Sequence, residues 1–103
     1  MIISTTEEIG KKYEVLGMVK GNTVQSKNVV RDVFAGLKTI IGGEIKGYTE
    51  MMTEAREKAT LRMFNEAKKM NADAIVSVRY TTSNIMQGSS EILVFGTAVK
   101  FKK

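Results

Sequence analysis

The sequence predicts an α+β domain of two layers, in which helices cover one face of an antiparallel sheet. The first observation behind this class is a change in apolar spacing along the chain, in the order strand, helix, helix, strand, strand. The second is size and composition: 103 residues with 43% hydrophobic and 26% charged residues are typical of one globular domain, here residues 1–103. Because there is no proline, glycines and small polar residues mark the element boundaries.

The first two predicted elements are a strand and an amphipathic helix. Residues 13–19, YEVLGMV, are rich in β-branched and aromatic residues, and Gly21-Asn22 is expected to end the strand. Residues 28–41 are predicted to be helical, with Asn28 as the N-terminal cap and Gly42 just past the end. The apolar residues at helical spacing in this segment are Val29, Val30, Val33, Phe34, Leu37, Ile40 and Ile41.

A longer helix is predicted from about Tyr48 to Met70, with Asn71 as a left-handed cap. Alanines in the middle of its apolar stripe allow a close approach to a sheet. Leu61 and Phe64 lie roughly opposite that stripe, and we expect them to form a subunit contact because a domain with so small a core often oligomerises. The stripe consists of Tyr48, Met51, Met52, Ala55, Ala59, Met63, Ala67 and Met70.

Two strands are predicted at residues 73–82 and 91–101, joined by a long connection at residues 83–90. In the first, alternation places Ala74, Val76, Val78 and Tyr80 on one face. The other face receives Ile75, Ser77, Arg79 and Thr81. The second strand is apolar on both faces, so we expect it to be central or covered on both sides.

Composition excludes several classes of site. Without cysteine or histidine, the chain has no disulfide, no zinc–cysteine cluster and no histidine base for a serine hydrolase. The net charge of +5 is spread in lysine pairs between acidic residues, and aromatic residues are not interleaved with it, so we expect no nucleic-acid partner. No apolar segment is long enough to cross a membrane and no signal peptide is evident, so a cytoplasmic location is the expectation.

Residues 42–49, GGEIKGYT, come close to a phosphate-binding loop. Gly42, Gly47 and Thr49 match the spacing of the motif, but Tyr48 replaces its lysine and Glu44 adds a carboxylate. The motif also needs a preceding strand, whereas the preceding residues are predicted to be helical. We therefore interpret the segment as a connector between two helices.

The remaining candidate sites are a carboxylate row and a polar pocket. Glu50, Glu54 and Glu57 share one helix face, which favours either a hard cation or a basic patch of another subunit, or else a solvated face with a Lys58–Glu54 pair. Tyr48, Arg56 and Glu44 could meet near the start of the long helix as a polar pocket. Four methionines (Met51, Met52, Met63 and Met70) could serve a soft metal, but their stripe position is more typical of core packing.

Several segments together resemble the YbjQ-like bacterial family, which is labelled heavy-metal-binding and has no established activity. The segments that carry the resemblance are RDVFAGLKTIIGGE (31–44), EAREKA (54–59), ADAIVSVR (72–79) and GTAV (96–99), together with MIISTT and GMVKG near the start. Asn71 stands where the family often has glycine, and both residues suit a left-handed cap.

The resemblance implies a dodecin-like α+β subunit in a ring-shaped homo-oligomer, most simply a pentamer, in which short strands at MIIS and TVQS join neighbours. It implies a metal ion as the possible ligand but supplies no catalytic or cofactor-binding residue. The leading hypothesis is a non-enzymatic ring that binds a cation at Glu44, Glu50 or Glu54, which symmetry would multiply. The alternatives are a structural or partner-binding ring, and an enzyme with an intersubunit site that includes Tyr48 and Arg56.

Overall fold

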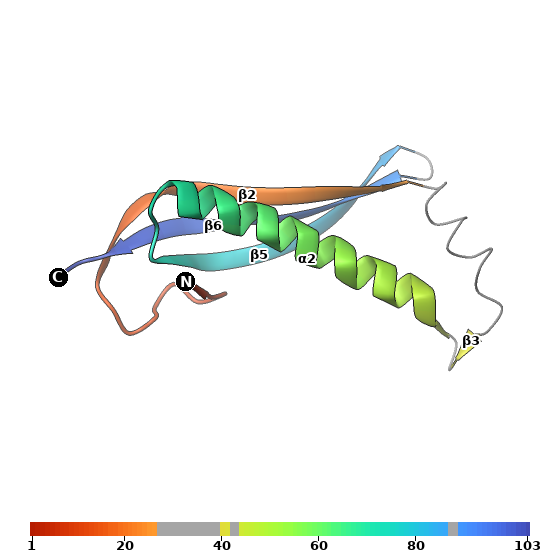
Figure 1. The fold of residues 1–103 in the computed structure, drawn as a ribbon, viewed down its shortest axis with the longest axis horizontal. Helices are drawn as coiled ribbons and strands as arrows, with labels where there is room; N and C mark the ends of the chain where they lie inside the picture. Colours follow the sequence, from red (N-terminus) through yellow and green to blue (C-terminus); the bar gives the residue numbers. More distant parts are fainter. Residues whose placement is uncertain (27–39, 42–43, 87–88) are drawn as a thin grey trace.

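The computed structural model describes residues 1–26, 40–41, 44–86 and 89–103, and these form a helix packed on a long sheet (Figure 1). The predicted two-layer α+β class is thereby confirmed. The elements are β1 (Ile2–Ile3), β2 (Tyr13–Ser26), β3 (Ile40–Ile41), β4 (Glu44–Ile45), α2 (Lys46–Lys69), β5 (Ala74–Met86) and β6 (Ser89–Phe101).

The main sheet has the strand order β1-β5-β6-β2. β6 pairs antiparallel with both β5 and β2, so the prediction of a central strand at residues 91–101 is confirmed. The sheet is mixed rather than wholly antiparallel, because β1 pairs parallel with β5. The segments MIIS and TVQS lie in the two edge strands of this sheet. Ile2–Ile3 pairs with β5 and Thr23–Ser26 with β6 of the same chain, and the expected pairing of these segments with neighbouring copies stays a prediction.

β2 and β5 are both longer than the sequence predicts. β2 passes through Gly21-Asn22 to Ser26, and β5 continues to Met86 through half of the expected connection. Ser83, for example, pairs with Glu91 of β6. The reason is that ladder hydrogen bonds use the backbone, so polar and glycine-containing stretches can continue a strand once the partner strand is in place.

A bulge at Ser77 changes which face of β5 points to the helix. Ser77 has a positive φ of 54°, and the pairing with β6 shifts between Val76 and Arg79. As a result, Val78 is buried in the helix-facing core with Ile75, whereas simple alternation placed it with Ala74 and Val76. Those two residues instead belong to a smaller cluster on the opposite face, around Val99.

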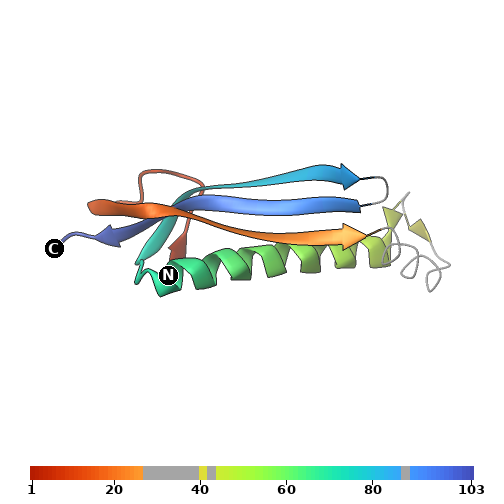
Figure 2. The same cartoon turned by 90° about the horizontal axis from the view of Figure 1, so that it is seen from above.

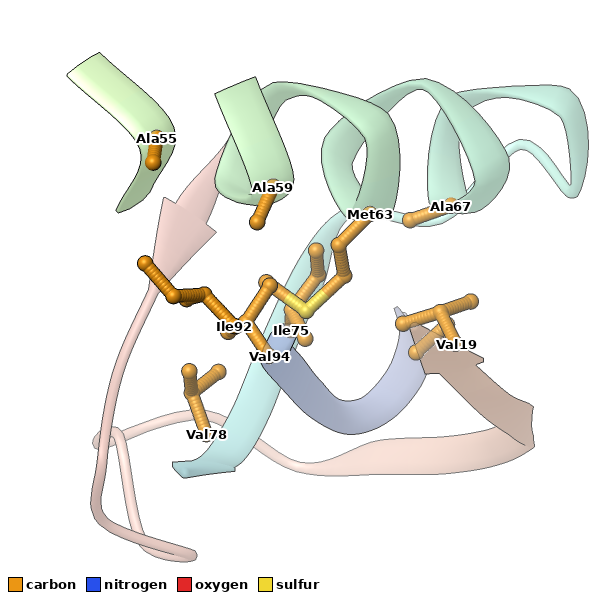
Figure 3. Packing of buried hydrophobic residues seen from close by; sticks show 10 residues of the cluster. Val19, Ala55, Ala59, Met63, Ala67, Ile75, Val78, Ile92 and Val94 are labelled. Atoms are coloured by element: carbon orange, nitrogen blue, oxygen red, sulfur yellow. The ribbon is translucent and has the colours of Figure 1, made fainter. Parts of the chain in front are cut away.

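The core lies between α2 and the sheet. The predicted alanine stripe is confirmed: Ala55, Ala59 and Ala67 are buried, with Met63 between them, against apolar residues of all three long strands (Figure 3). α2 packs mainly on β2 and β6 and little on β5. The approach is closest at Gly21, where an added Cβ would stand 2.1 Å from the carbonyl oxygen of Ala59. No side chain other than hydrogen fits there without a shift of the helix.

The ends of the long helix agree with the sequence to within two residues. It begins at Lys46 rather than Tyr48 and ends at Lys69. Asn71 has a φ of 59° and its N–H donates to the Lys68 carbonyl, so the predicted left-handed cap is confirmed.

The predicted helix at 28–41 lies largely outside the described residues. Its last two residues, Ile40 and Ile41, form β3 and pair with Ile45 and Glu44 of β4, so the helical prediction is wrong there. Both isoleucines are β-branched and suit a strand.

Candidate functional site

The acidic row of α2 is the first candidate site. Glu50, Glu54 and Glu57 are exposed, and the spacing of 3.6 residues per turn places them on one side of the helix. Within the described ranges none of the three is in a salt bridge, and the expected Lys58–Glu54 pair is not formed; the ion pair there joins Lys100 to Asp73. These carboxylates are therefore free to meet a cation or a second copy of the chain.

A heavy-metal site does not fit the donors of one copy. Soft metals prefer thiolate, thioether and imidazole ligands, and the chain contains no cysteine or histidine. Met63 is fully buried in the core, where it packs rather than binds. Across the parts of the chain that the structure describes, no three acidic side chains come together as a metal-binding group. Glu44 belongs to β4, and its side chain lies outside the described part.

The predicted polar pocket is not assembled by the described side chains. The guanidinium of Arg56 donates to the Thr53 hydroxyl on its own helix, 3.2 Å away. The side chains of Tyr48 and Glu44 lie outside the described part, so the pocket remains a prediction. Gly47 and Tyr48 lie inside α2. The second glycine of the apparent phosphate-binding motif is therefore a helix residue and not a loop residue. The element before α2 is the short strand β4, not the helix that we expected.

The predicted contact residues lie on the outside of α2. Leu61 is 57% exposed, and Phe64 is half-buried. Thr60 beside them shares a hydrogen bond of 2.8 Å with the hydroxyl of Tyr80, which fixes this side of α2 to β5. The predicted subunit contact is thus accessible on the surface of α2.

Two surface hollows accompany these features. One, of about 600 Å³, is lined by Glu7, Glu8, Gly10, Lys11, Lys12, Tyr13 and Lys102. Its polar groups are largely used locally, since Glu8 accepts from the Gly10 N–H and the Tyr13 hydroxyl donates to the Glu7 carbonyl. The other, of about 430 Å³, lies at the β2 edge, where Arg62 donates to the Asn22 carbonyl oxygen and Asn22 donates to Glu91.

The face of the sheet opposite α2 carries residues that the sequence did not single out. The pairing places Lys20 of β2 and Arg79 of β5 on either side of Phe95 in β6, in one row across this face. Met18, two residues before Lys20 on β2 and on the same face, is 67% exposed. Alternation within each strand contains this signal, but the row becomes visible once the register between strands is known.

The family model that matches residues 1–102 is that of the YbjQ-like proteins, described as "Putative heavy-metal-binding". The chain belongs to this family. Among YbjQ-like relatives, a UPF0145 protein of Colwellia psychrerythraea is 60% identical over 105 aligned positions and covers all of both chains. A UPF0145 protein of Vibrio parahaemolyticus is 63% identical over 102 positions, or 97% of each chain. The names of these YbjQ-like relatives specify no activity.

A solved structure supports the fold of this YbjQ-like chain. A protein of unknown function in the DUF74 family, from Pediococcus pentosaceus, has a TM-score of 0.69 and covers 99% of this chain and 98% of its own. At 17% identity this similarity concerns the fold alone. Within the described residues, none of the helices is long and apolar enough to cross a membrane.

Proposed function

We propose that this protein is a non-enzymatic homo-oligomer that binds a hard cation with carboxylates from more than one copy. The observation that supports this most directly is the pair Glu50 and Glu54. Both are exposed, are one helical turn apart and are outside the Lys100–Asp73 ion pair found in the described residues. Oxygen ligands suit Mg²⁺, Ca²⁺ or Mn²⁺, whereas the chain has none of the thiolate or imidazole ligands that soft metals select, because it contains no cysteine or histidine.

Several copies are needed because one copy supplies too few ligands. Ca²⁺ takes six to eight oxygens, and two exposed carboxylates on a solvated helix do not reach that number. A rotational axis would repeat Glu50 and Glu54, and Glu44 at the start of β4, in every copy. The ring-shaped pentamer that the family resemblance implies is the simplest such assembly, and the proposal retains a cytoplasmic location for it.

Calorimetry on chelator-stripped protein tests the cation site. Mg²⁺, Ca²⁺, Mn²⁺, Zn²⁺ and copper(I) are titrated separately into the wild type and into the variant E50Q/E54Q. We expect a hard cation to bind with fewer than one ion per chain, and the double variant to lose the binding heat. The control E14Q/E66Q removes the same charge from two other exposed glutamates and should bind as the wild type does.

If the protein is an oligomer but gives no binding heat with any of these ions, the proposed cation site is wrong. A structural or partner-binding ring is then the remaining hypothesis. Binding of one ion per chain that E50Q/E54Q leaves unchanged would place the site elsewhere.

A further inference from the structure

The hollow of about 600 Å³ lies at one end of the domain, beside the loop of residues 4–12 and the ends of β2 and β6. Figure 2 shows this loop, the end of the chain after β6 and the end of α2 together at that end of the molecule. The segments 7–14, 68–73 and 100–103 gathered there contain seven lysines but four acidic residues. This end of the molecule is therefore positively charged and attracts anions.

Two of these lysines face each other across the end of the sheet. Tyr13 pairs with Phe101, and the N–H of Lys102 donates to the carbonyl oxygen of Lys12 at 3.0 Å, so the ladder continues for one more pair. Opposite residues of an antiparallel pair have side chains on the same face, with Cβ atoms about 5 Å apart, and like charges placed in this way repel each other. Both lysines line the hollow. An anion between them would remove the repulsion.

The ammonium groups of this lysine pair are not neutralised by carboxylates in the described part of the chain. Glu7 and Glu8 also line the hollow, but neither forms a salt bridge with a lysine there; the ion pair of the described ranges joins Lys100 to Asp73. Glu8 is used within its own loop, where it accepts from the Gly10 N–H at 2.7 Å. The lysine pair can therefore give its charge and its N–H donors to a ligand.

Contacts within the chain hold the walls of the hollow in place without a ligand. The Tyr13 hydroxyl donates to the Glu7 carbonyl oxygen at 2.7 Å, which attaches the loop to β2. The Lys11 ammonium lies 4.8 Å from the centre of the Phe101 ring, and this cation–π contact attaches the loop to β6. A site with fixed walls loses less conformational entropy on binding, so these contacts favour a ligand.

The charge and the volume of the hollow together indicate the class of ligand. A lysine ammonium is a compact charge with three donors and is a common phosphate ligand, and two of them can share the oxygens of one phosphate group. The volume of about 600 Å³ is within the range of about 300–1,000 Å³ that is typical of small-molecule sites. It therefore leaves room for an organic group attached to the phosphate.

We propose that this hollow binds a phosphorylated small molecule, whose phosphate group lies between Lys12 and Lys102. Sugar phosphates and nucleoside monophosphates both carry this group, and the experiment distinguishes them. The hollow lies at the opposite end of α2 from Glu50 and Glu54. The proposal therefore depends neither on the cation nor on the homo-oligomer.

Calorimetry in phosphate-free buffer of low ionic strength tests the site. Inorganic phosphate, glucose 6-phosphate and AMP are titrated separately into the wild type and into K12Q/K102Q. The control K68Q/K69Q removes the same charge from two exposed lysines of the last helical turn that do not line the hollow. We expect one phosphate ester per chain to bind. The affinity should fall at least about tenfold in K12Q/K102Q, because charge-assisted hydrogen bonds are lost, and should stay close to the wild-type value in the control.

Amide chemical shifts in the wild type locate the ligand without any substitution. On titration with the ester that binds more tightly, we expect the N–H signals of Gly10, Lys12 and Lys102 to move most. Larger shifts in another part of the chain would place the ligand elsewhere and overturn the proposal.

Thermal unfolding without ligand tests the repulsion between the two lysines. K12Q should raise the unfolding midpoint by about 1–2 °C at low salt, and added salt should remove this gain. Both lysines are exposed, so the variant should fold, and circular dichroism checks this. A midpoint equal to that of the wild type would show that Lys12 and Lys102 do not repel each other, and would contradict a phosphate between them.

The remaining outcomes also decide the proposal. If none of the three probes binds, the hollow is not a phosphate site. If K68Q/K69Q loses as much affinity as K12Q/K102Q, the attraction belongs to the whole basic end and not to the hollow. Inorganic phosphate that binds as tightly as both esters would show that the organic group makes no contact, and the proposed class of ligand would be wrong.

Discussion

The hydroxyl of Thr23 donates a hydrogen bond of 2.6 Å to the carbonyl oxygen of Ala55, and this bond is buried between β2 and α2. Thr23 is the buried polar residue of the described core. Two positions earlier, Gly21 lets the backbone of β2 come against Ala59. These contacts determine how α2 lies on the sheet, and so the direction in which the side of α2 opposite its buried alanines points.

Replacement of Thr23 by valine should lower the free energy of unfolding by about 1 kcal/mol, because the side chain keeps its volume but loses the hydrogen bond. Urea unfolding of T23V and wild type measures the difference. T82V on exposed β5 is the matched control and should change stability little. Equal stability of T23V and wild type would show that the buried bond contributes nothing.

Gly21→Ala should be more destabilising, by about 1–3 kcal/mol, because the added methyl group meets helix backbone rather than a movable side chain. The comparison is with G10A, where the glycine has a φ of 78° but no atom lies within 4 Å of the added carbon. G10A should therefore show the backbone cost alone, about 1 kcal/mol. A G21A protein as stable as G10A would contradict the close contact.

Ser77 should tolerate glycine unusually well for a strand residue. Its φ of 54° is left-handed, so S77G relieves a strain that offsets the entropy cost of glycine, and stability should change little. T81G, in the same strand, should lose about 1 kcal/mol. Thermal unfolding of S77G and T81G measures the two changes in stability. Equal losses of stability in the two variants would argue against a bulge at Ser77.

Asp73 should make the free energy of unfolding depend on pH in the acid range. The Phe101 N–H donates to Asp73 Oδ2 at 2.8 Å, and this bond, with the nearby Lys100, lowers the pKa of Asp73 below its ordinary value of 3.8. Since the folded-state pKa is the lower one, the stabilisation is present above pH 3.8 and is lost as the pH falls through the folded value. D73N should lack this part of the acid dependence.

Urea titrations of D73N and wild type across the acid range measure this. The two proteins should differ near neutral pH and converge in strong acid. A constant difference at every pH would mean that the charge of Asp73 does not matter.

Much of the fold follows from apolar spacing. The α2 stripe from Ala55 to Ala67 and the central β6 were predictable because packing against the partner layer requires those residues. The bulge was not, because serine at 77 gives no local sign of a left-handed backbone. The full length of β2 and β5 was not predictable either. Their polar ends belong to the strands because their backbone groups pair with β6, and side-chain patterns do not reveal this pairing.

The candidate site was predictable in part. Helical spacing alone showed that Glu50 and Glu54 share a side of α2, and that Leu61 points away from the core. Lys20 and Arg79 are 59 residues apart in the sequence. They become neighbours of Phe95 through the register of two strand pairs, which no local pattern reveals.

Native mass spectrometry of the wild type, with a hard cation present, tests the central proposal most directly. We predict a particle whose mass is a whole multiple of 11.4 kDa, five copies in the simplest case, carrying fewer ions than chains. A single chain of 11.4 kDa at every concentration would contradict both the homo-oligomer and its shared cation site.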